Sequence, residues 1–141
     1  MGIESLGLEI RVVSNLIYNK INQLAMEAEN LTVHQCLILQ YLSQHSEKQV
    51  VQKDIEDLFS IRRSTANQML RTLADRGYIQ RTVSPEDSRK HILSATEKGF
   101  AASTHLTQDM YGFMKKLHGD IPKEELEQFE MTLYKLWHNI E

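Results

Sequence analysis

The spacing of apolar residues changes twice in the second half of the chain, and this change limits the folds that the sequence can adopt. Apolar residues recur every three or four positions over 52–59 and 64–76, which predicts two short helices joined by a brief turn. β-forming residues then flank a turn-rich tip at 84–90, which predicts a β-hairpin over 78–93. Helical spacing returns after the hairpin. This order of elements predicts a winged helix-turn-helix.

Helical spacing also extends to both ends of the chain. It predicts four further helices, over 3–28, 32–44, 96–118 and 122–140. Thr32 followed by Gln35 is a capping-box pattern at the start of the second of these, and Gly77 is placed to end the helix over 64–76. The fold class is therefore expected to be mainly α with a small β-hairpin, with additional helices at the N- and C-termini.

Composition argues against several other classes of protein. The longest apolar runs are only a few residues, whereas a membrane helix needs about 20. The first ten residues contain Glu4 and Glu9 and no early basic cluster, so a secretory signal is not expected. Cys36 is the single cysteine, which rules out an internal disulfide framework and any multi-cysteine zinc site. We therefore expect a cytoplasmic protein in a reducing compartment, without a membrane contact.

Positive charge is concentrated in one part of an acidic chain. The whole chain carries −3, whereas residues 61–92 hold seven bases and three acids, a net of +4, which leaves −7 for the remainder. The bases are Arg62, Arg63, Arg71, Arg76, Arg81, Arg89 and Lys90. Arginine predominates, and its planar fork pairs with phosphate or guanine. The island favours a local contact with a polyanion along one protruding edge; the alternative is a solvated charged face.

The second helix of the pair has residue types that can contact DNA. These residues occupy its start and its outer side: Arg62, Arg63, Ser64, Thr65, Asn67, Gln68 and Arg71. Its other face is apolar and is expected to join the core. The major groove admits one α-helix, in which arginine can bond guanine and Asn or Gln can pair with adenine. The alternative is a polar helix surface without a ligand.

The tip of the hairpin adds a second candidate DNA contact. Arg89 and Lys90 suit the minor groove, where the negative potential favours basic side chains. Asp87 can pair with Arg89 and hold it outward, so we expect Asp87 to orient the wing. The helix and the wing together predict double-stranded DNA as the partner.

Six short motifs follow one another between residues 31 and 99. They are Leu31-Thr32 with Gln35, Gln52-Lys53-Asp54-Ile55, Arg63-Ser64-Thr65, Gly77-Tyr78-Ile79 with Arg81, Ser84-Pro85-Glu86-Asp87-Ser88-Arg89 and Thr96-Glu97-Lys98-Gly99. In this order and spacing the stretch resembles the MarR family of bacterial winged-helix regulators, and the motifs cover about half of the chain. Val51 stands where the family usually has a capping Ser or Thr, so the helix over 52–59 is expected to have a weaker cap. Arg62 stands where a small polar residue is common and adds charge at the DNA face.

The resemblance implies a homodimer whose first and last helices interlock. Residues 1–30 and 100–141 would form the helical dimerisation region and residues 31–99 the DNA-binding region, in one intertwined domain. The implied function is transcription regulation, chiefly repression, on a pseudo-palindromic operator, with release by a small-molecule effector. Apolar stripes that soluble monomers avoid exposing agree with a dimer; they comprise Ile3, Leu6, Ile10, Phe129, Leu133, Leu136, Trp137 and Ile140. The alternative is that these helices pack on each other within one monomer.

Signals for other functions are weak. Cys36 lies among apolar residues and is expected to be a small core residue, not a sensor. No two histidines lie three or four positions apart, so a zinc-responsive regulator, using His34, His105 and a glutamate, stays an alternative only through tertiary contacts. An enzyme is not expected, because no glycine-rich loop is present and no base adjoins Cys36 in sequence. We expect no cofactor and no catalytic residue.

Two further expectations concern binding partners. The first, second and fifth helices of such a fold would enclose a partly apolar cleft, whose ligand the sequence does not identify. The other alternative to DNA binding is a winged helix that contacts a protein. Steep salt dependence is the property that separates DNA binding from a contact through an apolar surface.

Overall fold

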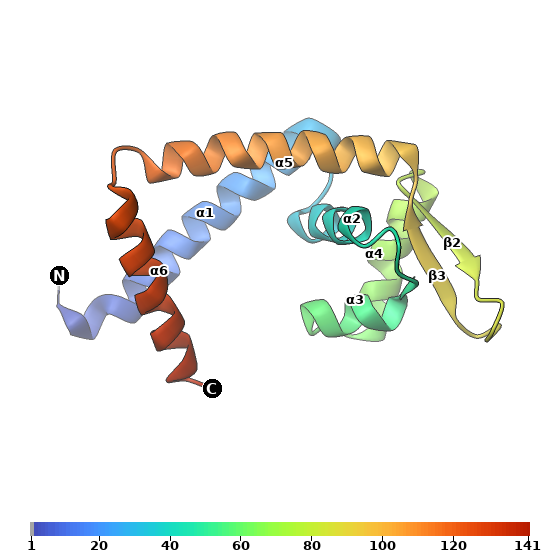
Figure 1. Ribbon diagram of the computed structural model, residues 1–141, viewed down its shortest axis with the longest axis horizontal. Helices are drawn as coiled ribbons and strands as arrows, with labels where there is room; N and C mark the ends of the chain where they lie inside the picture. The colour runs from blue at the N-terminus through green and yellow to red at the C-terminus, as the bar shows by residue number, and fades with distance from the viewer. Residues whose placement is uncertain (1) are drawn as a thin grey trace. The chain divides into compact units, whose positions relative to one another are not determined.

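The computed structural model describes residues 2–141, except the side chain of Ile3. It divides into two compact units, of which the first ends at Met110 and the second comprises Tyr111–Glu141. In chain order the elements are η1 (Ile3–Ser5), α1 (Leu6–Glu29), α2 (Val33–Gln44), β1 (Val50–Val51), α3 (Gln52–Phe59), α4 (Arg63–Asp75), β2 (Ile79–Val83), β3 (His91–Ala95), α5 (Glu97–His118) and α6 (Lys123–His138) (Figure 1). None of the helices in the described chain combines the length and the apolar character of a membrane span.

The predicted mainly α fold with a winged helix-turn-helix is confirmed. Helices α3 and α4 form the helix-turn-helix, and β2 and β3 form the wing, whose tip projects free of the helices (Figure 1). Within the described residues the sheet has three strands in the order β1-β3-β2, not the two of the predicted hairpin. The additional strand, β1, pairs antiparallel with β3 through Val50 opposite Leu93. It has only two residues, too few to show the alternation by which strands are recognised in a sequence.

The core of the first unit lies between α2, α3, α4 and the sheet, with further side chains from α1 and α5. Its fully buried large side chains are Leu31, Ile38, Leu39, Ile55, Leu70 and Leu73. The inner face predicted for α4 is confirmed, because Ala66, Leu70 and Leu73 are completely buried. At the end of α3, Leu58 is 50% exposed, whereas Phe59 packs against the core. Burial of one face of α4 leaves its opposite face free for a ligand.

The ends of α2 and α3 follow the expected capping chemistry. The Thr32 side chain accepts a hydrogen bond from the Gln35 backbone N–H at 3.3 Å, and the Gln35 side chain accepts one from the Thr32 N–H at 3.0 Å. At the start of α3, the Asp54 carboxylate accepts from the Val51 N–H at 2.8 Å. The Val51 side chain has no oxygen that could accept the Asp54 backbone N–H in return, so α3 has half of a capping box. The expected weaker cap is confirmed.

The junction between α4 and β2 is packed tightly. Gly77 has a φ of +80°, a conformation that glycine adopts without strain and that ends α4 as predicted. Thr96 fastens the start of α5 to this turn, because its hydroxyl donates to the Gly77 carbonyl at 2.6 Å and accepts from the Gly99 N–H at 3.1 Å. This packing fixes the direction in which β2 leaves the helix.

The same junction is attached to the end of α1. The guanidinium of Arg76 donates to the carbonyl oxygens of Glu29 and Asn30 at 2.8 and 2.7 Å. The Tyr78 hydroxyl donates to the Glu29 carboxylate at 2.9 Å. The last carbonyls of a helix lack donors within the helix, so Arg76 supplies donors that α1 needs. The α4–β2 junction is therefore fastened to the C-terminal end of α1.

Candidate nucleic-acid interface

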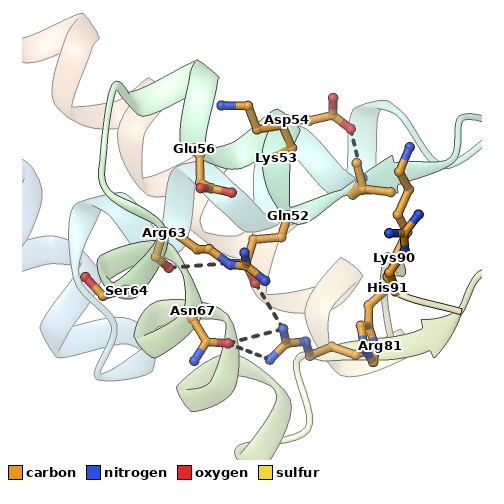
Figure 2. Close-up of a pocket in the computed structure, with 12 residues that line it drawn as sticks. Gln52, Lys53, Asp54, Glu56, Arg63, Ser64, Asn67, Arg81, Lys90 and His91 are labelled. Atoms are coloured by element: carbon orange, nitrogen blue, oxygen red, sulfur yellow. Dashed lines mark hydrogen bonds between the residues drawn. The ribbon is translucent and has the colours of Figure 1, made fainter. Parts of the chain in front are cut away.

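A groove of about 1090 Å³ runs between the start of α4, α3 and the base of the wing. Figure 2 shows its lining, which is Val51, Gln52, Lys53, Asp54, Glu56, Arg63, Ser64, Asn67, Arg81, Arg89, Lys90 and His91. Five of these residues are basic and two are acidic, which gives the lining a net charge of +3 with His91 neutral. The groove is thus a concave, positively charged surface on an acidic chain.

The predicted contact residues of α4 divide into two groups. Arg63, Ser64 and Asn67 are exposed and line the groove. The others, which are also exposed on the helix or at its N-cap but are not among the described lining residues, are Arg62, Thr65, Gln68 and Arg71. Arg71 lies 4.0 Å from the Asp75 carboxylate, an exposed contact that contributes little to stability. Three residues at the start of α4 therefore line the groove together with the wing.

The wing tip carries Lys90 and the pair of Asp87 with Arg89. Arg89 and Lys90 are exposed and line the groove. The Asp87 carboxylate accepts from the Arg89 backbone N–H at 3.0 Å and from Arg89 Nε at 3.2 Å. These bonds, first that of the backbone and then that of the side chain, hold the pKa of Asp87 below its usual value. The predicted pairing of Asp87 with Arg89 is confirmed.

The expectation that all seven basic residues of 61–92 gather on one protruding edge of the protein is wrong for Arg76. Its guanidinium binds the carbonyls at the end of α1 and lies 5.2 Å from the centre of the Tyr78 ring. The last carbonyl groups of α1 lack hydrogen-bond donors within the helix, and Arg76 supplies them. This contact joins residues 46 and 47 positions apart, so local sequence patterns do not indicate it. Arg76 therefore serves the fold, whereas Arg63, Arg81, Arg89 and Lys90 line the groove.

Sequence reasoning missed several groove residues, of which Arg81 and Gln52 form the most contacts. The sequence pattern includes Arg81 in the basic region but not among the predicted contacts. Its guanidinium donates to the Asn67 side-chain oxygen and to the Gln52 side-chain oxygen (Figure 2). The alternation of β2 is a signal that could have found Arg81. It places Arg81 on the same side of the strand as the buried Ile79, facing the rest of the protein and not the solvent.

Several charged residues of α3 form hydrogen bonds or ion pairs within the protein. The Asp54 carboxylate accepts the Val51 N–H, and Lys53 Nζ lies 2.8 Å from the Asp57 carboxylate. Glu56 is the acidic lining residue without an assigned hydrogen bond in the described chain. The free positive charge of the groove therefore lies mainly on α4 and on the wing.

A second, smaller cavity of about 210 Å³ lies in the first unit between α1, α2 and α5. Its lining is mostly apolar, with Cys36, Gln40 and Asp109 among the polar side chains. The expected cleft between these three helices is thus present. Burial, and then the charge of Glu29, raise the pKa of the Cys36 thiol to about 11, so this thiol stays protonated at neutral pH.

The histidines proposed for a zinc site lie in different surroundings. The His34 ring packs edge-on against Phe59, whereas His105 lies between the carboxylates of Glu29 and Asp109, at 3.6 and 3.8 Å. Among the residues that the structure describes, no three His, Cys, Asp or Glu side chains are grouped so that they could hold a metal ion.

The apolar residues predicted for a dimer interface are largely exposed in each unit. In the first unit, Leu6 is 40% exposed and Ile10 is partly buried, while the Ile3 side chain lies outside the described residues. In the second unit the predicted interface residues with large exposed fractions are Phe129 at 57%, Trp137 at 62% and Ile140 at 86%. Leu133 is 36% exposed and Leu136 is partly buried. Both units therefore present apolar surface.

Comparisons with known proteins agree with this architecture. A family model described as MarR family matches residues 29–90. The HTH-type transcriptional regulator PapX of Escherichia coli is 28% identical over 100 residues, which cover 71% of this chain and 61% of PapX, so the match spans less than two thirds of that relative.

Solved structures extend the likeness over nearly the whole chain. The transcription regulator MarR from Oenococcus oeni PSU-1 is 30% identical, with 94% of this chain and 98% of that chain covered and a TM-score of 0.71. MepR of Staphylococcus aureus, in its complex with DNA, is 24% identical with both chains fully covered and a TM-score of 0.85, and it shows a shared fold. The winged helix, the family match and the likeness to these regulators together place the chain in the MarR family of transcription regulators.

Proposed function

We propose that this chain regulates transcription by binding a pseudo-palindromic DNA operator as a homodimer. The start of α4 would enter the major groove, where its contacts would be Arg62, Arg63, Ser64, Thr65, Asn67, Gln68 and Arg71. The wing would place Arg89 and Lys90 at the minor groove, with Asp87 orienting Arg89. The observation that carries this proposal is the groove with a net charge of +3 between these two elements.

The homodimer is proposed from the exposed apolar surface. Residues 1–30 and 100–141 would form the dimerisation region, and residues 31–99 the DNA-binding region. In α1 the exposed side chains include Leu8 at 69%, Val12 at 57% and Leu16 at 64%, and α6 adds Phe129 and Trp137. Soluble chains rarely leave so many large apolar groups in water without a partner. A two-fold dimer would place two recognition helices about 34 Å apart, one turn of DNA.

Repression in the cytoplasm, relieved by a small molecule, is proposed as the way in which the protein acts. The cavity between α1, α2 and α5 would hold the effector, and its lining favours a ligand with a substantial apolar part. The attachment of α1 to the α4–β2 junction through Arg76 offers a physical connection from this cavity to the recognition helix. An effector would act if it bound better to an arrangement in which the two recognition helices no longer fit one DNA duplex.

Selection of bound fragments from random DNA tests the proposed function. We expect enrichment of a sequence with two inverted half-sites whose centres are one helical turn apart, and binding that weakens steeply with salt. A Lys90→Ala variant should lower affinity and reduce the salt slope, whereas the matched Lys48→Ala variant, which removes an exposed lysine outside the groove lining, should not. Absence of any enriched sequence, or equal effects of the two variants, would contradict the proposal.

A further inference from the structure

Arg81 connects the elements that surround the groove. From β2, its Nη1 and Nη2 atoms donate to the Asn67 side-chain oxygen on α4 at 3.4 and 3.3 Å, and Nη2 also donates to the Gln52 side-chain oxygen on α3 at 3.1 Å (Figure 2). The Gln52 side-chain nitrogen donates in turn to the Arg63 carbonyl at 3.3 Å. One guanidinium therefore links the base of the wing to both helices of the helix-turn-helix.

The position of Arg81 is fixed by the sheet. Arg81 lies opposite the buried Leu93 in the β2–β3 ladder, whereas the exposed basic residues of the wing tip, Arg89 and Lys90, lie eight and nine residues further along the chain. Its side chain is half-buried, and its Nε is buried without a hydrogen-bond partner in the described part of the chain. A guanidinium anchored in this way and already donating to two side-chain oxygens is placed to orient its neighbours.

This arrangement decides which end of the Asn67 side chain is available to DNA. A carboxamide carries an acceptor oxygen and a donor NH2 group. Pairing with adenine uses both, because the amide donates to N7 and accepts from the N6 amino group. In this protein the oxygen of Asn67 faces the Arg81 guanidinium, so an adenine N6–H would have to approach an oxygen already bonded to a cation. The exposed NH2 group can still donate to an acceptor: guanine offers N7 and O6 and thymine offers O4, whereas adenine offers N7 beside an N6 amino group that would be left without an acceptor.

We infer that Arg81 is a positioning residue that restricts Asn67 to donating hydrogen bonds, so that the base facing Asn67 presents an acceptor edge in the major groove. This differs from the adenine contact expected from the residue type alone. The inference rests on the proposed function, because it concerns the reading of DNA by α4. It assigns a role in base selection to a residue that contacts no base itself.

Affinity measurements on duplexes that differ at single base pairs test this role. The position read by Asn67 is the one whose base preference disappears in Asn67→Ala. At that position the unaltered protein should prefer guanine or thymine over adenine by about tenfold, the discrimination typical of a good side-chain contact. Arg81→Met removes the donors, frees the amide and should abolish that preference while the preferences at other positions remain.

Two further variants separate orientation from charge and from folding. Asn67→Asp keeps an acceptor for Arg81 but replaces the donor, so preference should invert toward bases that donate, cytosine or adenine. Because Asn67→Asp retains the contact with Arg81, it tests the inference even if Arg81→Met does not fold. Lys90→Met removes the same charge from the groove lining without a contact to Asn67, and it should weaken binding to all duplexes alike.

The outcomes distinguish this inference from the proposed function. A preference for adenine at the Asn67 position in the unaltered protein would overturn the inference while leaving DNA binding intact. So would an Arg81→Met variant that loses affinity equally on every duplex and keeps its preference for guanine or thymine, because Arg81 would then act only on stability or charge. If the unaltered protein selects no sequence at all, the proposed function itself fails, and this inference fails with it.

Discussion

Arg89 Nε lies 3.2 Å from Asp87 Oδ1, and the Arg89 backbone N–H donates to the same oxygen at 3.0 Å. The carboxylate thus holds the arginine at the wing tip while leaving its side chain 90% exposed. Because these bonds lower the pKa of Asp87, the pairing is lost only when the pH falls through that lowered pKa. The wing-tip pair should therefore persist unchanged across neutral pH.

Arg89→Ala should weaken DNA binding without unfolding the protein. The variant removes an exposed cation whose proposed role is a minor-groove contact, so the plot of log affinity against log salt should become less steep by about one unit. Binding titrations at several salt concentrations measure this slope. Asp87→Asn is the matched control, since it keeps Arg89 and should lower affinity without flattening the slope. Unchanged affinity of Arg89→Ala would mean that the wing does not touch DNA.

Arg63→Ala should impair the reading of one base. Arg63 lies exposed in the first turn of α4 and lines the groove; its carbonyl accepts from Gln52, and within the described residues its side chain has no assigned hydrogen bond. If its side chain bonds a base edge, the variant should cost about 1–3 kcal/mol on the preferred site and relax selectivity at one position. Competition between the preferred duplex and its single-base variants measures the effect. An equal loss on all sequences would assign Arg63 to a phosphate.

Glutamate at Phe129 or Trp137 should convert a dimer to monomers. These side chains are 57% and 62% exposed on α6, and a charge there would have to be buried in the proposed interface. Sedimentation at micromolar concentration should show a dimer for the unaltered chain and a smaller species for Phe129→Glu. Gln128→Glu adds the same charge to a polar exposed position of α6 and should leave the dimer intact. A monomeric unaltered chain would remove the model of two half-sites.

Local chemistry explains what the sequence could predict about the fold and the candidate site. The reciprocal bonds of Thr32 and Gln35 and the pairing of Asp87 with Arg89 join residues two or three positions apart. The buried face of α4 follows from helical spacing. The roles of Arg76 and Arg81 do not follow from local spacing, since their partners lie 14 to 47 residues away; alternation indicates only on which side of β2 Arg81 lies. Long-range hydrogen bonds therefore determine, more than the helices and strands themselves, which basic residues line the groove.

Cys36 should react slowly with alkylating reagents at neutral pH. Burial and the nearby charge of Glu29 raise the pKa of its thiol to about 11, so roughly 0.1% would be thiolate at pH 8. The alkylation rate of the folded protein should still be rising as pH approaches 11, whereas the denatured chain should show the ordinary cysteine value of 9.0. The same difference lowers stability as pH rises from 9 toward 11, because the unfolded chain loses this proton first. A plateau near pH 9 in the folded protein would contradict the shift and reopen a sensing role for this thiol.

Gly99→Ala should destabilise the protein strongly, whereas Gly112→Ala in the same helix should not. A Cβ at Gly99 would lie 2.1 Å from the carbonyl oxygen of Tyr78, and that carbonyl is held in place by the Thr96 N–H at 3.0 Å. Because backbone, not a flexible side chain, must move, we expect a loss of about 1–3 kcal/mol in the free energy of unfolding. A Cβ at Gly112 would meet no described atom within 4 Å outside the backbone of its own helix, so alanine there should stabilise α5 by roughly 0.5–1 kcal/mol. Denaturant titrations at one fixed protein concentration compare the two variants. Equal stabilities would show that the start of α5 does not pack closely against the α4–β2 junction.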